Sequence, residues 1–289
     1  MRQLIVAIFI LVSIVGLLDC VASFEQAATV QERPMSSKEV MKAIREHDWD
    51  IVARPLAAPV SLADEIGRDL PQLDNESKEI AVATLEHIHS PTSSGLLLRM
   101  TGDSNLQVAA AAARTLLRVL HIPPVDDILA AISQRENDFV RGRLYLLAGR
   151  ANEAGKLQAL RALVNNEKNP DSALDAQAAM VKLGGEPERA AFLERIRTAR
   201  PDQATRASDH LLYINDSRLA KGMIPWLSNK SPVFRLGTDR DERAARMCDL
   251  AVYTAHQLGI KFYMEPQGIA NFEASIIANA EKAVLALPD

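Results

Sequence analysis

Apolar residues recur along most of the chain at spacings of three and four, the period of an α-helix with one buried face. The segment VDDILAAI (125–132) places Val125, Ile128, Leu129 and Ile132 on one stripe, and LAKGMIPWL (219–227) repeats the pattern. Alternating runs of β-branched residues, typical of half-buried strands, are absent, and aromatic residues make up 4% of the chain. The pattern therefore predicts an all-α protein.

The predicted helices recur in pairs, each a short helix, a polar turn and a longer alanine-rich helix. The short helices carry a branched apolar anchor at intervals of 31 to 33 residues, at Ile66, Leu97, Ile128, Leu160, Leu193 and Ile224. One such pair cannot bury its apolar stripes alone, so neighbouring pairs must stack. The spacing predicts an α-solenoid, or superhelix, of about six helix pairs.

Residues at the expected starts and ends of the predicted helices are types that favour those positions. Aspartates near the starts of the second helices are predicted N-caps that accept backbone N–H groups: Asp74, Asp103, Asp138, Asp171, Asp202 and Asp241. Pro124 and Pro187 are predicted first helical positions. Gly149, Gly184 and Gly259 are predicted to close helices in the left-handed conformation.

The segments DSNLQVAAAAARTL and NDFVRGRLYLLAG resemble HEAT repeats. Their spacing is similar to that of the short HEAT-like repeats first associated with phycobilin lyases, and the resemblance covers about residues 61–259. Tetratricopeptide repeats are the alternative, but their Trp, Gly and Tyr positions are not recognisable here. We expect an N-terminal helical cap at 24–60, the repeats at 61–264 and a C-terminal capping helix at 265–289.

The first 23 residues have the order of a secretory signal peptide: a charged start (MRQ), an apolar run (residues 4–18) and the small residues of CVAS. The run is shorter than the roughly 20 residues of a spanning helix. Cleavage near Ser23 would give an exported, periplasmic or extracellular protein with no stable membrane insertion. The alternative is a lipoprotein anchored through Cys20, although Asp19 occupies a position where such signals usually have a small residue.

The charge of the chain indicates which class of partner it binds, and its cysteine content indicates whether disulfides stabilise the fold. The net charge is −4 at pH 7 and the basic residues are not clustered, which argues against a nucleic-acid partner. After cleavage only Cys248 remains of the two cysteines, so packing rather than an internal disulfide must stabilise the fold.

The segment MCDLAVYTAHQLG (247–259) gathers residues that could carry chemistry. On a helix, Cys248 falls on an apolar stripe that runs from Ala244 to Leu258. Asp249 and His256 are seven residues apart, about 10 Å along the axis, whereas chelation on one helix uses an i, i+4 pair. The segment is therefore interpreted as a packed helix with a polar edge.

Other histidines are no stronger candidates. His87 and His89 point in different directions on a helix. The neighbours in SDH (208–210) cannot form a triad, whose members must converge from separate elements. We expect no catalytic residue, no metal and no cofactor.

The segment LSNKSPVFRLGTDR (227–240) is longer than the other turns, and is either a solvated insertion or a binding loop. The predicted function is a non-catalytic scaffold that binds a protein or peptide on its concave face and on the loop at 228–240. The predicted contact residues are Lys230, Phe234, Arg235, Arg240, Arg243, Arg246, Asp249, Tyr253 and His256. Further polar residues expected on the concave face are Arg114, Arg118, Arg141, Arg143, Arg206 and His210. The alternatives are an enzyme, which the resemblance to bilin lyases implies, and a ligand-free structural segment of an envelope assembly.

Overall fold

The structure is a computed structural model, and it describes residues 34–53, 59–236, 243–263 and 271–288. Most of these residues are helical, which confirms the predicted all-α character. The predicted signal peptide, with Cys20, lies outside the described residues. None of the helices in the described ranges is long and apolar enough to cross a membrane.

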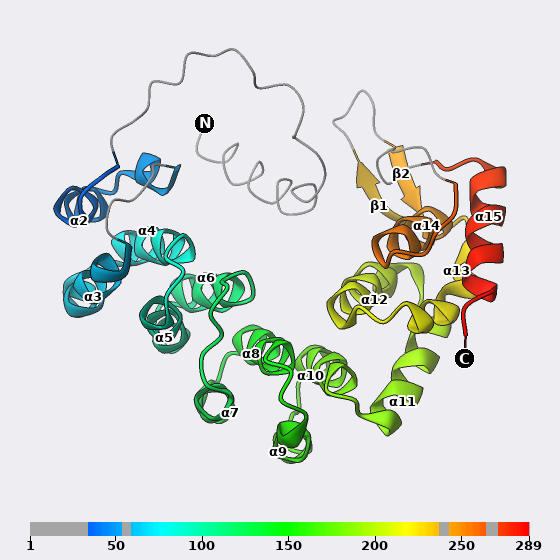
Figure 1. Ribbon diagram of the computed structural model, residues 1–289, viewed down its shortest axis with the longest axis horizontal. Helices are drawn as coiled ribbons and strands as arrows, with labels where there is room; N and C mark the ends of the chain where they lie inside the picture. The colour runs from blue at the N-terminus through cyan, green and yellow to red at the C-terminus, as the bar shows by residue number, and fades with distance from the viewer. Residues whose placement is uncertain (1–33, 54–58, 237–242, 264–270, 289) are drawn as a thin grey trace, which may run out of the picture.

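The longer helices form two rows along a curved path (Figure 1). The inner row comprises α4 (Asn75–Glu86), α6 (Leu106–Leu116), α8 (Asp138–Arg150), α10 (Pro170–Lys182), α12 (Pro201–Ile214) and α14 (Met247–Gln257). The outer row comprises α3 (Pro59–Asp69), α5 (Pro91–Met100), α7 (Val125–Gln134), α9 (Leu157–Val164) and α11 (Glu186–Arg197). Each inner helix contacts the next along the row. The result is an arc whose inner side is built from the second helices of the predicted pairs.

Shorter elements complete the chain. At one end, α2 (Ser37–Arg45) contacts α3 and α4 and is followed by the 3-10 helix η1 (Trp49–Ala53). At the other end, α15 (Ala274–Leu285) contacts α13 (Ile224–Leu227) and α14. The remaining 3-10 helices are η2 (Leu70–Gln72), η3 (Ala154–Lys156) and η4 (Ser217–Met223).

Most of the predicted anchors are core residues. Ile66, Leu97, Ile128 and Leu160 are fully buried. Leu193 and Ile224 are only half-buried, because Phe192 and Ile196 in α11 and Trp226 in α13 provide the buried side chains there.

Five of the six predicted N-cap positions lie within two residues of the observed N-cap, and the sixth, Asp241, lies five residues before Arg246, the N-cap of α14. Asp74 caps α4 by accepting from Ser77 N. Three other inner helices are capped by an asparagine instead, and these are Asn105, Asn137 and Asn169. Both side chains offer an oxygen to the free N–H groups of the first turn, so the aspartates signalled the right turns but not the right positions.

Of the three glycines predicted to close a helix in the left-handed conformation, two do so and one does not. Gly184 (φ 88°) and Gly259 (φ 75°) are left-handed as predicted. Gly149 lies inside α8, and Asn152 (φ 57°) takes the left-handed conformation after that helix. A Cβ atom on Gly149 would lie 2.8 Å from the Cα atom of Ala179 in α10. The role of Gly149 is therefore to let two inner helices approach closely.

The segment after α13 is a β-hairpin rather than a long loop. Strand β1 (Pro232–Leu236) pairs antiparallel with β2 (Arg243–Arg246), with Phe234 opposite Ala245. Helix α14 then begins at Met247, so the predicted helix start at Asp241 and the inclusion of Ala244 in the helical stripe were wrong. Strand pairing explains the extra length, because residues 232–236 and 243–246 form two paired strands between α13 and α14.

The buried apolar side chains form two clusters. The first extends from Val40 in α2 to Leu183 after α10, and the second from Leu146 in α8 to Val284 in α15. Helices α8 and α10 contribute to both, so the two clusters meet at the middle of the arc.

Candidate functional site

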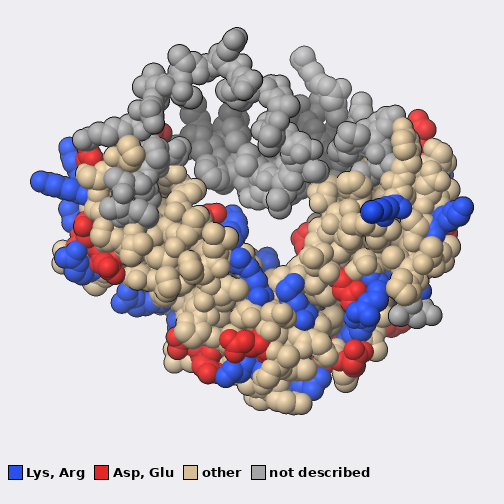
Figure 2. Space-filling model, in the orientation of Figure 1, with Lys and Arg blue, Asp and Glu red and all other residues tan. Residues whose placement is uncertain are grey.

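A hollow of about 630 Å³ opens on the inner side of the arc, over α8, α10 and α12. Its lining includes Phe139, Arg143, Asp171, Asp175, Arg206, Asp209, His210 and Tyr213. Lys and Arg side chains border this inner edge (Figure 2). Aromatic, basic and acidic groups therefore share one concave surface.

The close approach of α8 and α10 sets the depth of this hollow. A Cβ atom on Gly142 would lie 3.3 Å from Cγ of Asp175, and Gly149 meets Ala179 in the same interface. Ala176 and Ala179 on the facing side of α10 are fully buried. Small residues on both helices thus bring the carboxylate of Asp175 close to the backbone of α8.

A hydrogen-bonded network of side chains surrounds Asp175. Its Oδ1 accepts from Nε2 of His210 at 2.7 Å and from Nη2 of Arg206 at 2.9 Å. Arg195 reaches in from the outer helix α11 and donates from Nη2 to Nδ1 of His210 at 3.0 Å. An arginine can only donate, so Nδ1 is the acceptor and the proton of a neutral imidazole is on Nε2.

The electrostatics of this network agree with that tautomer. Burial lowers the pKa of His210, and the nearby Arg195 and Arg206 add to the decrease, against the opposing effect of Asp175. Burial on its own would raise the pKa of Asp175, but the hydrogen bonds from His210 and Arg206 more than offset it and leave the pKa lowered. The network thus contains an ionised carboxylate and a neutral histidine.

These contacts leave His210 poorly placed for acid–base chemistry. A general base needs a free lone pair within reach of the proton that it removes, and the lone pair of Nδ1 faces Arg195. Ser208, two residues before it, is hydrogen-bonded to Thr254 at 2.6 Å instead. Ser208 is therefore bonded away from His210, whereas Asp209 and His210 both line the hollow.

Two arginines of neighbouring inner helices converge on one aromatic ring. The guanidinium carbon of Arg143 lies 4.9 Å from the centroid of Phe139, and that of Arg114 in α6 lies 5.7 Å from it. Phe139 is 40% exposed. Burial lowers the pKa of Arg114, and repulsion by Arg118 and Arg143 lowers it further, against the opposing attraction of Glu79. We call Arg114, Phe139 and Arg143 the arginine–phenylalanine cluster.

The residues predicted at the partner surface differ in exposure. Lys230 and His256 are exposed, Phe234 and Tyr253 are half-buried, and Phe234 packs against the second apolar cluster. Arg235 and Arg243 lie on β1 and β2, and Arg240 is outside the described residues. His256 has the ring of Phe262 at 6.3 Å, in an edge-on arrangement.

Asp249 was wrongly predicted at the surface, because its side chain is fully buried. Its carboxylate accepts from Arg246 at 2.7 Å and from the backbone N of Phe272 at 3.0 Å. These bonds join the start of α14 to the segment before α15. Arg141 is likewise occupied, by Glu167 at 2.8 Å and by Asp138.

Cys248 occupies the core, as the sequence predicted, with 1% of its surface exposed. Burial raises the pKa of its thiol, which makes it a weak nucleophile. In the described ranges, His, Cys, Asp and Glu do not form a group of three that could hold a metal ion.

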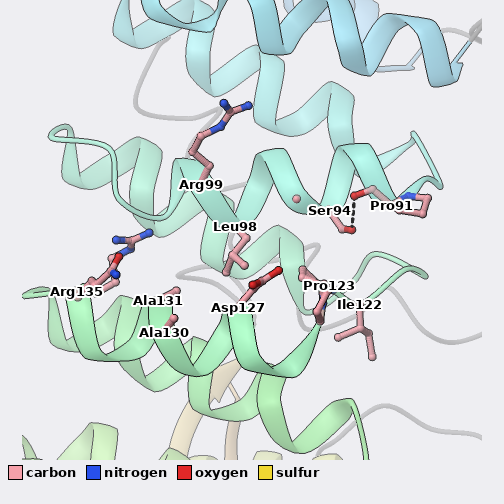
Figure 3. A pocket seen from close by; sticks show the side chains of 13 residues that line it. Pro91, Ser94, Leu98, Arg99, Ile122, Pro123, Asp127, Ala130, Ala131 and Arg135 are labelled. Carbon is pink, nitrogen blue, oxygen red and sulfur yellow. Dashed lines mark hydrogen bonds between the residues drawn. The ribbon is translucent and has the colours of Figure 1, made fainter.

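A smaller hollow of about 320 Å³ lies between α5 and α7 of the outer row (Figure 3). Leu98, Ala131 and Ile122 contribute apolar lining. Two polar side chains at its edges have local partners: Ser94 donates to the backbone O of Pro91, and Arg135 donates to Thr101 at 3.1 Å. This groove offers shape but no converging reactive groups.

Several residues that line the inner hollow were not expected there from the sequence, among them Phe139, Asp175 and Asp209, and neither was Arg195, which contacts His210 from α11. Asp175 and Arg195 carry no signal of their own, because a polar residue within a helix is ordinarily solvent-facing. Comparisons with family models, with curated proteins and with solved structures find no match for this chain.

Proposed function

We propose that the chain is a solenoid of HEAT-like helix pairs that binds a protein partner on the inner side of its arc. Two rows of helices, each inner helix in contact with the next, are the arrangement such repeats produce when they stack. The helix pairs also recur with the 31 to 33 residue spacing of the anchors.

The hollow with the arginine–phenylalanine cluster is the observation that carries this proposal. Arginine and aromatic residues are enriched where proteins bind each other and often supply most of the binding energy. Phe139 is exposed although it is a large apolar residue. A partner side chain placed on this ring would bury it between the two arginines.

A non-catalytic role is proposed over an enzyme of the bilin-lyase type. The histidine nearest to a carboxylate in the hollow, His210, is held by hydrogen bonds on both ring nitrogens. Cys248 is buried away from the hollow and its thiol pKa is raised. We propose further that the protein is exported, on the strength of its first 23 residues. Neither a cofactor nor a nucleic-acid partner belongs to this proposal.

A second part of the partner surface is proposed at the hairpin. Lys230 is exposed beside β1, and His256 is exposed on α14. Both are available to a partner, whereas Asp249 and Arg246 bind each other. The identity of the partner is left to capture experiments.

The proposed function is tested by capture from an extract of the cell envelope, with the exported protein immobilised. The test variant is Phe139→Asp, and the matched control is Val60→Asp, which places the same charge at an exposed apolar position of α3. We expect the parent and the Val60 variant to capture one partner protein that the Phe139 variant loses. Equal capture by all three would refute the inner surface as the binding site, and absence of any captured protein would refute the scaffold function.

A further inference from the structure

The arginine–phenylalanine cluster brings two positive charges together, and the nearby acids, Glu79 for Arg114 and Asp209 for Arg143, attract them without a direct ion pair among the described residues. Arg114 and Arg143 both stack on Phe139. Neither forms an ion pair with a carboxylate in the part of the chain that the structure describes, whereas neighbouring Arg118 pairs with Glu86 at 2.7 Å. Two guanidinium groups that approach the same ring repel each other, and a bound anion would relieve that repulsion.

The other basic groups around the hollow already have partners. Arg206 is bonded to Asp171 and Asp175. Arg150 donates to the backbone O of Leu117 at 2.9 Å, and Lys182 donates to that of Tyr213 at 2.7 Å. These bonds hold the carboxyl ends of neighbouring helices. Among the described residues around the hollow, Arg114 and Arg143 are thus cations without an ion pair or a hydrogen-bond acceptor, and their donors are available to a ligand.

We propose that the hollow, together with Arg114 beside it on the Phe139 ring, binds an acidic segment of the partner protein, with a carboxylate between Arg114 and Arg143 and an apolar side chain on Phe139. This inference rests on the proposed scaffold function and names the chemistry of its partner. The planar guanidinium groups present paired N–H donors that match the two oxygens of a carboxylate.

The charges around the cluster favour a peptide over a nucleic acid. Asp138 and Asp171 are at least half exposed at the lining of the hollow, and Asp209 lies there as well. A single carboxylate adds one negative charge beside Asp209, which Arg143 already attracts. A chain of phosphates would have to pass beside these acids, and nucleic-acid surfaces instead present continuous positive charge.

The size of the hollow fits this class of ligand. A volume of about 630 Å³ is within the range of sites that enclose small molecules. It can therefore take a few side chains of a peptide rather than a folded domain. Leu117 and Leu146 also contribute to the lining, which gives an apolar side chain beside the carboxylate further contacts.

The test starts from a phage-displayed library of random short peptides selected on the full-length exported protein. Peptides that also bind the double variant Arg114→Gln/Arg143→Gln are discarded. The matched control is Lys42→Gln/Arg197→Gln, which removes the same charge from exposed positions of α2 and α11. Selected peptides are then synthesised with a fluorescent label, with and without replacement of Asp and Glu by their amides, and titrated by anisotropy.

We expect the selected peptides to be rich in Asp or Glu next to an apolar residue. The amide peptides should bind the parent about tenfold more weakly or worse, as loss of a charge-assisted hydrogen bond implies. The control variant should bind the acidic peptides like the parent. If the double variant has reduced helical circular dichroism, its weaker binding could reflect misfolding. The comparison of acidic and amide peptides on the parent protein then tests whether a carboxylate is required.

Three results would overturn the inference: no peptide that depends on the two arginines, selected peptides without acidic residues, or a single-stranded DNA probe that binds more tightly than the acidic peptides. An envelope partner captured equally by the parent and the double variant would reject this site and leave the scaffold function intact. Acidic peptides bound through the two arginines, with no envelope partner captured, would support the site and count against the scaffold function.

Discussion

Replacing Gly149 by alanine tests the close packing of α8 and α10. The added Cβ atom would lie 2.8 Å from both the Cα and the Cβ atoms of Ala179, and would also meet the hydroxyl group of Tyr213. A side chain can rotate away from such a contact, but a backbone atom moves only if its helix does. We therefore expect α10 to be displaced from α8.

The magnitude follows from three effects. Overpacking a tight interface costs about 1–3 kcal/mol of the free energy of unfolding. Displacing Tyr213 weakens its 2.6 Å hydrogen bond to the backbone O of Leu146, which adds roughly 1 kcal/mol or more. Alanine returns at most about 1 kcal/mol of helix propensity. The net loss is about 2 kcal/mol, equivalent to a decrease in Tm of about 4–8 °C for a chain of this size.

Gly95 provides the matched control. It lies in the interior of α5, and a Cβ atom there would meet no other atom within 4 Å. Gly95→Ala should therefore gain the helix propensity without the clash and raise Tm by about 2–4 °C. Both variants are compared with the parent by thermal and urea unfolding, followed by far-ultraviolet circular dichroism. If Gly149→Ala melts at or above the temperature of Gly95→Ala, the close contact between α8 and α10 is wrong.

Three further predictions concern single groups. Cys248→Ala should lower the free energy of unfolding by about 1 kcal/mol, measured in urea, and leave partner capture unchanged; a bound metal that disappears with the thiol would contradict its structural role. The pKa of His210 in the folded protein is below its ordinary value of 6.5. The stability that neutral His210 contributes is therefore complete above pH 6.5 and is lost as the pH falls from 6.5 toward the pKa of the folded protein. The urea midpoint should thus decrease between about pH 7 and pH 5 more steeply in the parent than in His210→Gln, and equal slopes would refute the assignment. Mass spectrometry of the exported protein should show an N-terminus near residue 24, whereas intact Met1 on the soluble protein would contradict cleavage and a lipidated Cys20 would favour the anchored alternative.

The hairpin changes one test that the sequence alone would suggest. Replacing a solvated loop by a short turn should leave Tm nearly intact, but β1 pairs with β2, and Val233 and Phe234 pack against the core. Removing the segment would therefore destabilise the protein. Lys230→Glu reverses one exposed charge there instead, so a loss of partner capture can be separated from a loss of folding.

The sequence predicted the parts of the fold that depend on local repetition. Helix pairs leave a periodic trace, since each pair must present an apolar stripe to its neighbours, and Ile66 to Leu160 were found in this way. The hairpin was missed because its second strand reads RAAR, without the alternation that marks a strand. Gly149 was misread because glycine suits both a helix end and a close helix contact, and only the neighbouring helix decides between them.

The hollow could be predicted only in part, because its contacts also depend on neighbouring helices. Arg114, Arg143, Arg206 and His210 were expected on the concave face from their positions in the second helices. Their partners are far away in sequence: His210 binds Asp175, 35 residues earlier, and Arg195 enters from the other row. Such contacts depend on how far one pair rotates relative to the next, and the repeat spacing does not specify that rotation.

The division of the core into two apolar clusters has a consequence for how the chain opens. Linear arrays lose cooperativity where the coupling between neighbouring units is weakest. Here α8 and α10 contribute to both clusters and are packed closely through Gly142 and Gly149, so the weaker couplings lie on either side of this pair, between α6 and α8 and between α10 and α12. The amide hydrogens of α4 and α6 are therefore expected to exchange with solvent as one unit and those of α12 and α14 as another. A ligand bound across α8, α10 and α12 would slow amide exchange in both units, so that the two would open together as one cooperative unit.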